Sequence, residues 1–186
     1  MRIDENGNVW WIIIPVVIIA LGLTGCSNSS YGAARTYTAV KGGSNSPNCY
    51  AYAIGLRKAL NPGSLSGKTP RFNDVDEVAD AVISDLKKIG RSARIIRRVN
   101  SSIKDNEYRI ALKCGKKPYG CNIYGKPVYD YHFMVQHCDG RWSEKHGITG
   151  DSILHAFGKN PNNISWNLGN LKNYYNSNVI YLAITR

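Results

Sequence analysis

The clearest repeating pattern along the chain is a stripe of apolar residues spaced three and four positions apart between residues 75 and 89. This period places apolar side chains on one face of an α-helix. Asn73 or Asp74 can cap the N-terminus of this helix, and Gly90 can end it. The first turn is acidic and the last turn contains two lysines, which is the charge distribution that the helix dipole favours. The pattern predicts an amphipathic helix packed into the core. Its apolar face consists of Val75, Val78, Ala79, Val82, Leu86 and Ile89.

A second helix is predicted over residues 49–60, where apolar residues predominate and Gly55 is the single breaker. Asn48 is a good N-cap because its side chain can accept a hydrogen bond from a free amide of the first turn. The run Asn61-Pro62-Gly63 stops the segment. Since much of the helix is apolar, we expect it to be central and buried.

The second half of the chain alternates between extended and polar segments. Segments 132–136 and 141–145 form a predicted hairpin around the turn pair Asp139-Gly140. Region 147–178 is rich in Asn and Gly and shows little periodicity beyond a turn at 152–157. Helices followed by an antiparallel sheet define an α+β fold. The predicted strands are 94–99, 108–114, 132–136, 141–145 and 179–185.

Composition sets the size of the domain. With 186 residues, 43% of them hydrophobic, the chain can form one domain with its own core, which we assign to 47–186. Residues 27–46 are rich in Ser, Gly, Ala and Asn and are predicted to be a linker. The net charge of +11, concentrated in 87–126, favours anionic partners such as nucleic acid, acidic lipid headgroups or cell-wall polymers; a solvated basic face also explains it.

Residues 1–26 are predicted to be a signal or membrane-anchor segment. Stretch 9–25 is apolar and uncharged, at the lower length limit of a membrane-spanning helix. The run Leu23-Thr24-Gly25-Cys26 resembles the lipobox of bacterial lipoproteins, which implies cleavage before Cys26 and a lipid on its thiol. The acidic start is unusual for an export signal, so an uncleaved anchor is an alternative. A third is a remnant of a larger protein, because 3–8 resembles the spacer that ends an Rhs-type repeat. Each interpretation places the domain at or beyond a membrane.

Two residues carry the candidate chemistry. Cys49 stands at the predicted start of a helix, and His132 at the predicted start of a strand. A helix N-terminus and a nearby imidazolium both favour the thiolate form of a cysteine, and the histidine can later protonate a leaving group. The alternative is that Cys49 is a small buried hydrophobic residue.

The contexts of both residues resemble those of a known group. The run Pro47-Asn48-Cys49-Tyr50-Ala51-Tyr52-Ala53 and the run Asp130-Tyr131-His132-Phe133 resemble uncharacterised bacterial domains found at toxin C-termini. The order of a helix cysteine followed by a strand histidine is similar to the broader papain-like and NlpC-type cysteine peptidases. The resemblance spans 47–147 and implies a nucleophile helix packed on an antiparallel sheet. It also implies Cys49 as nucleophile and His132 as general base.

The third catalytic residue depends on the loop length at Asp139-Gly140. A two-residue loop would place Ser143 and Lys145 on the face of His132, and a three-residue loop would place Glu144 and His146 there instead. Because a lysine cannot accept a hydrogen bond from the imidazole, we favour the longer loop, with Glu144 first and His146 second. The resembling domains often carry a histidine at the position of Glu144, and Glu144 could also be an exposed strand residue.

Other residues receive secondary assignments. The oxyanion hole would use the backbone amide of Cys49 with Asn48 or Asn45, although Asn48 could act as the cap alone. Cys114 and Cys121 could form a disulfide in an oxidising compartment. Their spacing suits no common zinc site. No cofactor or metal is expected. Three tyrosines flank the predicted site. We expect them to pack in the core or, alternatively, to form the floor of a substrate groove; they are Tyr50, Tyr52 and Tyr131. We expect His137 and His155 to lie on the surface and assign them no role.

The sequence thus predicts an exported or membrane-anchored thiol hydrolase that acts on peptide or amide bonds of cell-wall peptide or of a target protein. A toxin-associated domain of this kind could have an immunity protein as partner. Deamidation and acyl transfer would use the same residues. The alternative is a non-enzymatic module that binds an anionic polymer through its basic face. A nuclease is disfavoured because the chain lacks a carboxylate cluster and a paired-histidine arrangement, so nucleic acid is not expected as a partner.

Overall fold

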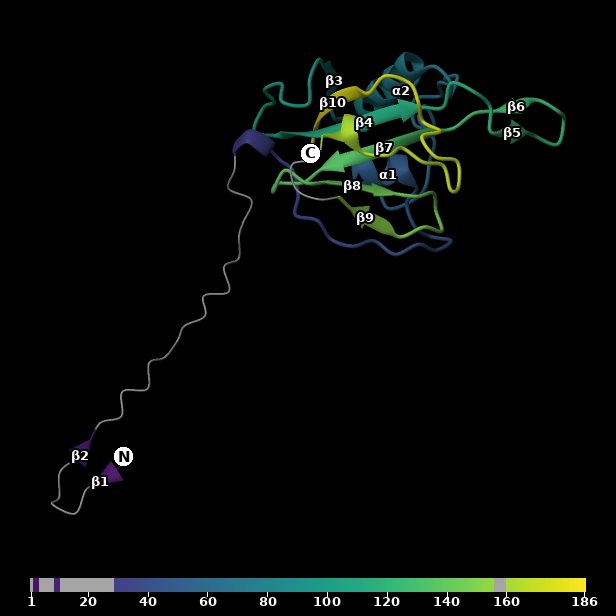
Figure 1. Ribbon diagram of the computed structural model, residues 1–186. Coiled ribbons are helices and arrows are strands. Elements are labelled where there is room, and N and C mark those ends of the chain that lie inside the picture. Colours follow the sequence, from purple (N-terminus) through teal and green to yellow (C-terminus); the bar gives the residue numbers. More distant parts are fainter. Residues whose placement is uncertain (1, 4–8, 11–28, 156–159) are drawn as a thin grey trace.

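The computed structural model describes residues 2–3, 9–10, 29–155 and 160–186 (Figure 1). Arg2–Ile3 (β1) pairs antiparallel with Val9–Trp10 (β2). Cys26 and most of the predicted leader lie outside these residues, so the lipidation assignment stays a prediction. No helix within the described ranges is long and apolar enough to cross a membrane.

A six-stranded antiparallel sheet forms the centre of the domain (Figure 1). Its strand order is β3-β10-β4-β7-β8-β9, so the last strand of the chain lies between two earlier ones. This arrangement confirms the α+β class. The strands are β3 (Ala93–Ile96), β4 (Glu107–Cys114), β7 (Tyr131–Gln136), β8 (Trp142–Lys145), β9 (Ser152–Leu154) and β10 (Ile180–Thr185).

One face of the sheet is covered by the helices α1 (Cys49–Ile54) and α2 (Val75–Lys88). The predicted α2 is confirmed, with the side chain of Asp74 accepting from two first-turn amides. Helix α1 is shorter than predicted because Gly55 adopts φ +77° and its N–H bonds back to carbonyls of the helix. A left-handed glycine ends a helix in this way at little steric cost, so the break comes at Gly55 and not at Asn61.

The other face of the sheet is covered by the aperiodic C-terminal region, which includes the short 3-10 helix Pro161–Asn163 (η2). Trp166 is fully buried there, and its indole N–H donates to the Pro161 carbonyl at 2.7 Å. Tyr175 and Trp142 pack in the same cluster. Because both faces are covered, β7 is buried at every position, so a polar side chain on either face of this strand must find a partner within the protein.

Residues 120–128 form a small exposed hairpin of β5 (Gly120–Cys121) and β6 (Pro127–Val128), which extends away from the sheet in Figure 1. The predicted Cys114–Cys121 disulfide is wrong. Both are free thiols, with Cys114 buried at the end of β4 and Cys121 exposed on this hairpin. The hairpin directs Cys121 away from the core that encloses Cys114.

The segment 27–46, predicted as a linker, lies against the domain over much of its described part, which begins with the 3-10 helix Ser29–Tyr31 (η1). Ala33 donates its backbone N–H to the Glu107 carbonyl at 2.7 Å. Further on, Ser152 donates to the Val40 carbonyl at 2.8 Å. The packed body of the protein therefore includes residues that precede Pro47.

A chain of hydrogen bonds crosses the core beneath α1. His137 Nδ1 lies 3.0 Å from the Arg35 carbonyl, which can only accept, so Nδ1 carries the proton. His137 Nε2 then accepts from the Ser143 hydroxyl at 2.6 Å, and that oxygen accepts from Tyr52 at 2.7 Å. The surface position predicted for His137 is wrong, because the residue is fully buried. Burial lowers the pKa of His137 from 6.5 to about 4.

We expect this depressed pKa to make stability pH-dependent between pH 6.5 and about 4. In that window the unfolded chain binds a proton at residue 137 that the folded chain does not, so the free energy of unfolding falls as the pH falls. The loss is about 3 kcal/mol at the lower end. Urea unfolding at pH 7 and pH 4 should show this extra loss in the wild type relative to His137→Gln. Equal losses in the two proteins would contradict the assignment.

Candidate active site

The geometry of the site begins with the hairpin that joins β7 to β8. The His137 N–H donates to the Arg141 carbonyl at 2.8 Å, and Gly140, with φ +81°, closes a loop of three residues. Met134 consequently faces Glu144 across the pair. This confirms the predicted three-residue loop, and it places Glu144 on the same face of the sheet as His132.

His132 and Glu144 form a buried pair on that face. His132 Nε2 lies 2.6 Å from Glu144 Oε2, and the two residues are 2% and 3% exposed. Burial would raise the pKa of Glu144, but hydrogen bonds from His132, His146 and His155 outweigh it and hold the pKa well below its usual range. An ionised carboxylate can only accept, so Nε2 of His132 carries the proton. The other ring nitrogen, Nδ1, is then left as an acceptor.

Two further histidines complete the surroundings of Glu144. His155 Nε2 lies 2.9 Å from Oε1, and His146 Nε2 lies 3.5 Å from the same oxygen. The hydrogen bond between His146 and Glu144 raises the pKa of His146, whereas burial lowers it. The surface position predicted for His155 is wrong. Its backbone N–H bonds to the Trp142 carbonyl, just beyond the end of β9, which brings its ring to Glu144. Nothing in its aperiodic sequence context marked this position.

Aromatic packing fixes the plane of the His132 ring. The ring is nearly parallel to that of His146, with centroids 5.0 Å apart, and to that of Tyr175, at 5.2 Å. Trp166 meets its edge at 6.0 Å. The Tyr175 hydroxyl is itself held by a 2.8 Å hydrogen bond to Asp130. The imidazole is thus held through one nitrogen and by its ring contacts, while Nδ1 makes no hydrogen bond within the described residues.

Cys49 is the first residue of α1, and its sulfur lies against the start of β7. Strand β8 pairs with β7 only from Met134 onward, and the thiol contacts the backbone before that point. Sγ is 3.9 Å from the Tyr131 carbonyl, and the Phe133 N–H also interacts with it. These two residues flank His132 on the strand. The structure therefore brings the sulfur to the stretch of backbone from which the imidazole projects.

Cys49 is 6% exposed as a residue, and burial raises the pKa of its thiol above the ordinary value. Asp130 and Glu144 add to this increase, and the amides of Phe133 and Tyr50 oppose it. A neutral thiol is accordingly the resting form at neutral pH. Reaction at this sulfur requires a base that removes its proton as the bond to a substrate forms.

Cys49 and His132 line one cleft with a volume of about 580 Å³. Its walls come from α1, β7 and the loops that follow β8 and Trp166. Tyr131 belongs to the wall, with its hydroxyl bonded to Asn61 at 2.7 Å. By contrast, Tyr50 bonds to Asp85 in the core. Other lining residues include Asn48, Phe72, Tyr119, Asp130, His146, Gly147, Thr149, Leu168 and Tyr175.

The assignment of Asn48 to an oxyanion hole meets an obstacle. Its Oδ1 accepts from the Ala51 amide at 3.1 Å, and its Nδ2 donates to the Leu60 carbonyl at 2.9 Å. The side chain thus serves as the helix cap and as a tie to the next loop. The other candidate, Asn45, is exposed and does not line the cleft. The backbone N–H of Cys49, which stands at the first helical position, has no partner within the helix and remains the better donor.

Lys145 is a buried cation that the sequence pattern did not mark as part of the site. Its ammonium group donates to the carbonyls of Gly147, Ile148 and Gly150 at 2.8–3.0 Å, which satisfies its three donors. Two of these residues, Gly147 and Ile148, line the cleft. Burial lowers the pKa of Lys145, while Asp151 and Cys49 raise it. Lys145 therefore holds the rim of the cleft and contributes positive charge near the thiol.

One group in the described part of the chain could hold a metal ion. Ligand atoms of His132, Glu144 and His146 lie within 4.8 Å of one another. Two imidazoles and a carboxylate are a ligand set that zinc accepts. The nitrogen and oxygen atoms involved already bond to each other, however. A cation here would replace the hydrogen bond between His132 and Glu144 and would remove the support of the imidazole.

Comparison of the chain with protein-family models, with curated proteins and with solved structures found no match.

Proposed function

We propose that the protein is a thiol hydrolase of peptide or amide bonds with a papain-like arrangement of helix and sheet. The observation that supports this best is the buried His132–Glu144 hydrogen bond of 2.6 Å in the wall of the cleft that also contains Cys49. A carboxylate behind an imidazole, with a nucleophile on the other side, is the arrangement of catalytic triads. The packing of α1 against β7 and β8 is consistent with the proposed fold.

In the proposed reaction, Sγ of Cys49 attacks the carbonyl carbon of the substrate while its proton passes to Nδ1 of His132. The ionised Glu144 stabilises the imidazolium that forms. The backbone N–H of Cys49 donates to the oxygen on which negative charge develops. The imidazolium then protonates the leaving amine, and water hydrolyses the thioester. Because the resting thiol is neutral, His132 acts as a true general base.

Two substrates are proposed, and both are argued from the sequence. Export or membrane anchoring through residues 1–26 would place the cleft next to cell-wall peptide, and the toxin-like resemblance favours a protein of a target cell. Both substrates offer the amide bond that the reaction requires.

Alkylation of the thiols tests the proposed pair. Iodoacetamide at pH 7.5, followed by peptide mass spectrometry, should label Cys49 at a rate that falls at least about tenfold in His132→Ala, since a positioned base accelerates such steps by about 10²–10⁴. Glu144→Gln should give a smaller decrease. Cys121 is exposed on its hairpin and provides an internal standard in every sample. A Cys49 rate that is the same in wild type and His132→Ala would rule out the activated pair.

Hydrolysis is tested on candidate substrates directly. Purified peptidoglycan and a mixture of denatured proteins should release new amine termini with the wild type, detected by mass spectrometry of the soluble products. Cys49→Ser should abolish release, while Cys121→Ser, which changes an exposed thiol, should leave it unchanged. If Cys49→Ser retained all release, Cys49 would not be the nucleophile and the proposed reaction would be wrong. If the wild type bound anionic polymer without releasing any amine termini, the non-enzymatic module would be the better description.

A further inference from the structure

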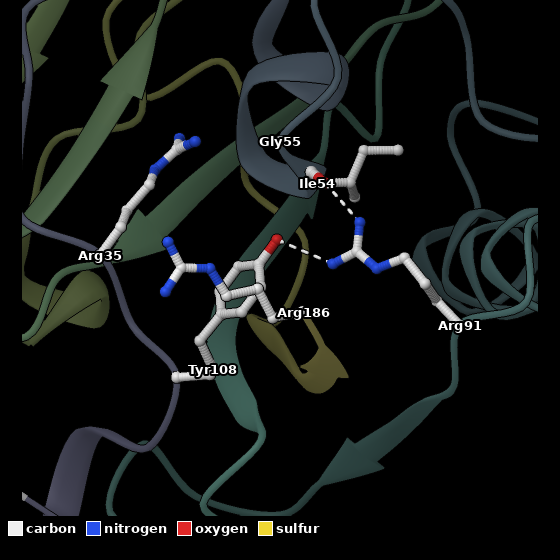
Figure 2. A pocket seen from close by; sticks show the side chains of 7 residues that line it. Arg35, Ile54, Gly55, Arg91, Tyr108 and Arg186 are labelled. Carbon is white, nitrogen blue, oxygen red and sulfur yellow. Dashed lines mark hydrogen bonds between the residues drawn. The ribbon is translucent and has the colours of Figure 1, made fainter.

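A second pocket lies at the C-terminal end of α1, away from Cys49 at the first position of that helix (Figure 2). Its volume is about 300 Å³. Its lining combines cationic side chains with a tyrosine and small apolar groups. The lining residues are Ala33, Arg35, Ile54, Gly55, Arg91, Tyr108 and Arg186.

Three arginines from distant parts of the sequence meet in this pocket. Arg35 follows η1, Arg91 follows α2, and Arg186 follows β10. Across the ranges that the structure describes, none of the three forms an ion pair with a carboxylate. Like charges that share a small pocket repel each other. Among the described residues, no carboxylate pairs with these guanidinium groups to offset the repulsion.

Hydrogen bonds within the protein account for the positions of two of these three arginines. Arg91 donates to the carbonyls of Thr185 and Ile54 and to the Tyr108 hydroxyl, two of which Figure 2 shows. Arg35 donates to the Tyr52 carbonyl at 2.9 Å. These bonds satisfy carbonyls at the end of α1 and fix two guanidinium groups.

Many guanidinium donors stay available. A guanidinium group has five N–H donors, so several remain on Arg35 and Arg91. The side chain of Arg186 donates to no partner in the described ranges. Capping of α1 accounts for Arg35 and Arg91 but not for the third arginine.

We propose that this pocket binds a phosphate group with two negative charges, carried by a phosphomonoester or a diphosphate. Planar guanidinium groups form paired hydrogen bonds with phosphate oxygens, and three cations match a doubly charged group better than a single carboxylate. Ile54 and Tyr108 offer surface for a small organic part beside it. The side chain of Arg186 would hydrogen-bond only to the ligand, whereas Arg35 and Arg91 also donate hydrogen bonds to carbonyls of α1.

Titration calorimetry of the full chain with pyrophosphate, at ionic strength matched with sodium chloride, tests this site. We expect saturable binding that Arg186→Gln weakens about tenfold, the effect of losing a hydrogen bond to a charged group. Arg98→Gln, which removes an exposed charge elsewhere, should bind like the wild type. Cys49→Ala should also bind normally, so this result does not depend on the proposed catalysis.

A second arm distinguishes a soluble phosphate from a lipid headgroup. Flotation with vesicles that contain phosphatidic acid is compared with flotation with phosphatidylcholine vesicles. Loss of phosphatidic acid binding in Arg186→Gln, without pyrophosphate binding in the wild type, assigns the site to a lipid. If Arg186→Gln and Arg98→Gln behave alike in both arms, the pocket does not select phosphate and the proposal is wrong.

Discussion

Burial of the Glu144 carboxylate is the constraint on which the rest of the site depends. An ionised carboxylate removed from water is costly unless it is paired and hydrogen-bonded, and Glu144 is 3% exposed. His132, His146 and His155 supply that pairing from three separate positions. The hairpin loop, the end of β9 and the aromatic cover over His132 are therefore linked through one side chain.

Strand β8 carries two buried charges side by side in sequence, and they serve opposite faces of the sheet. Glu144 faces the histidines, while Lys145 faces the α1 side and donates to three carbonyls in the loop at the rim of the cleft. Alternation along a strand separates the two charges, so they do not neutralise each other directly. Instead, one orients the proposed base and the other holds the loop beside the proposed nucleophile.

Features set by local sequence could be predicted, and features set by tertiary packing could not. Helix α2 has a full set of end signals and a clear stripe, and its bounds agree with the structure. The partner position of Glu144 followed from counting residues across a short hairpin. In contrast, Gly55 ended α1 early. The burial of His137 and the approach of His155 to Glu144 depend on segments without periodicity, and the burial of Lys145 depends on loop carbonyls that no pattern encodes.

The protonation state of the His132 ring tests the central claim most directly. Nitrogen NMR of the protein labelled at histidine should find the proton of neutral His132 on Nε2, facing Glu144, with Nδ1 unprotonated and free to accept a proton from Cys49. A neutral His132 with its proton on Nδ1 would contradict the account, because Glu144 would then not set the tautomer and the ring could not act as the base for the thiol.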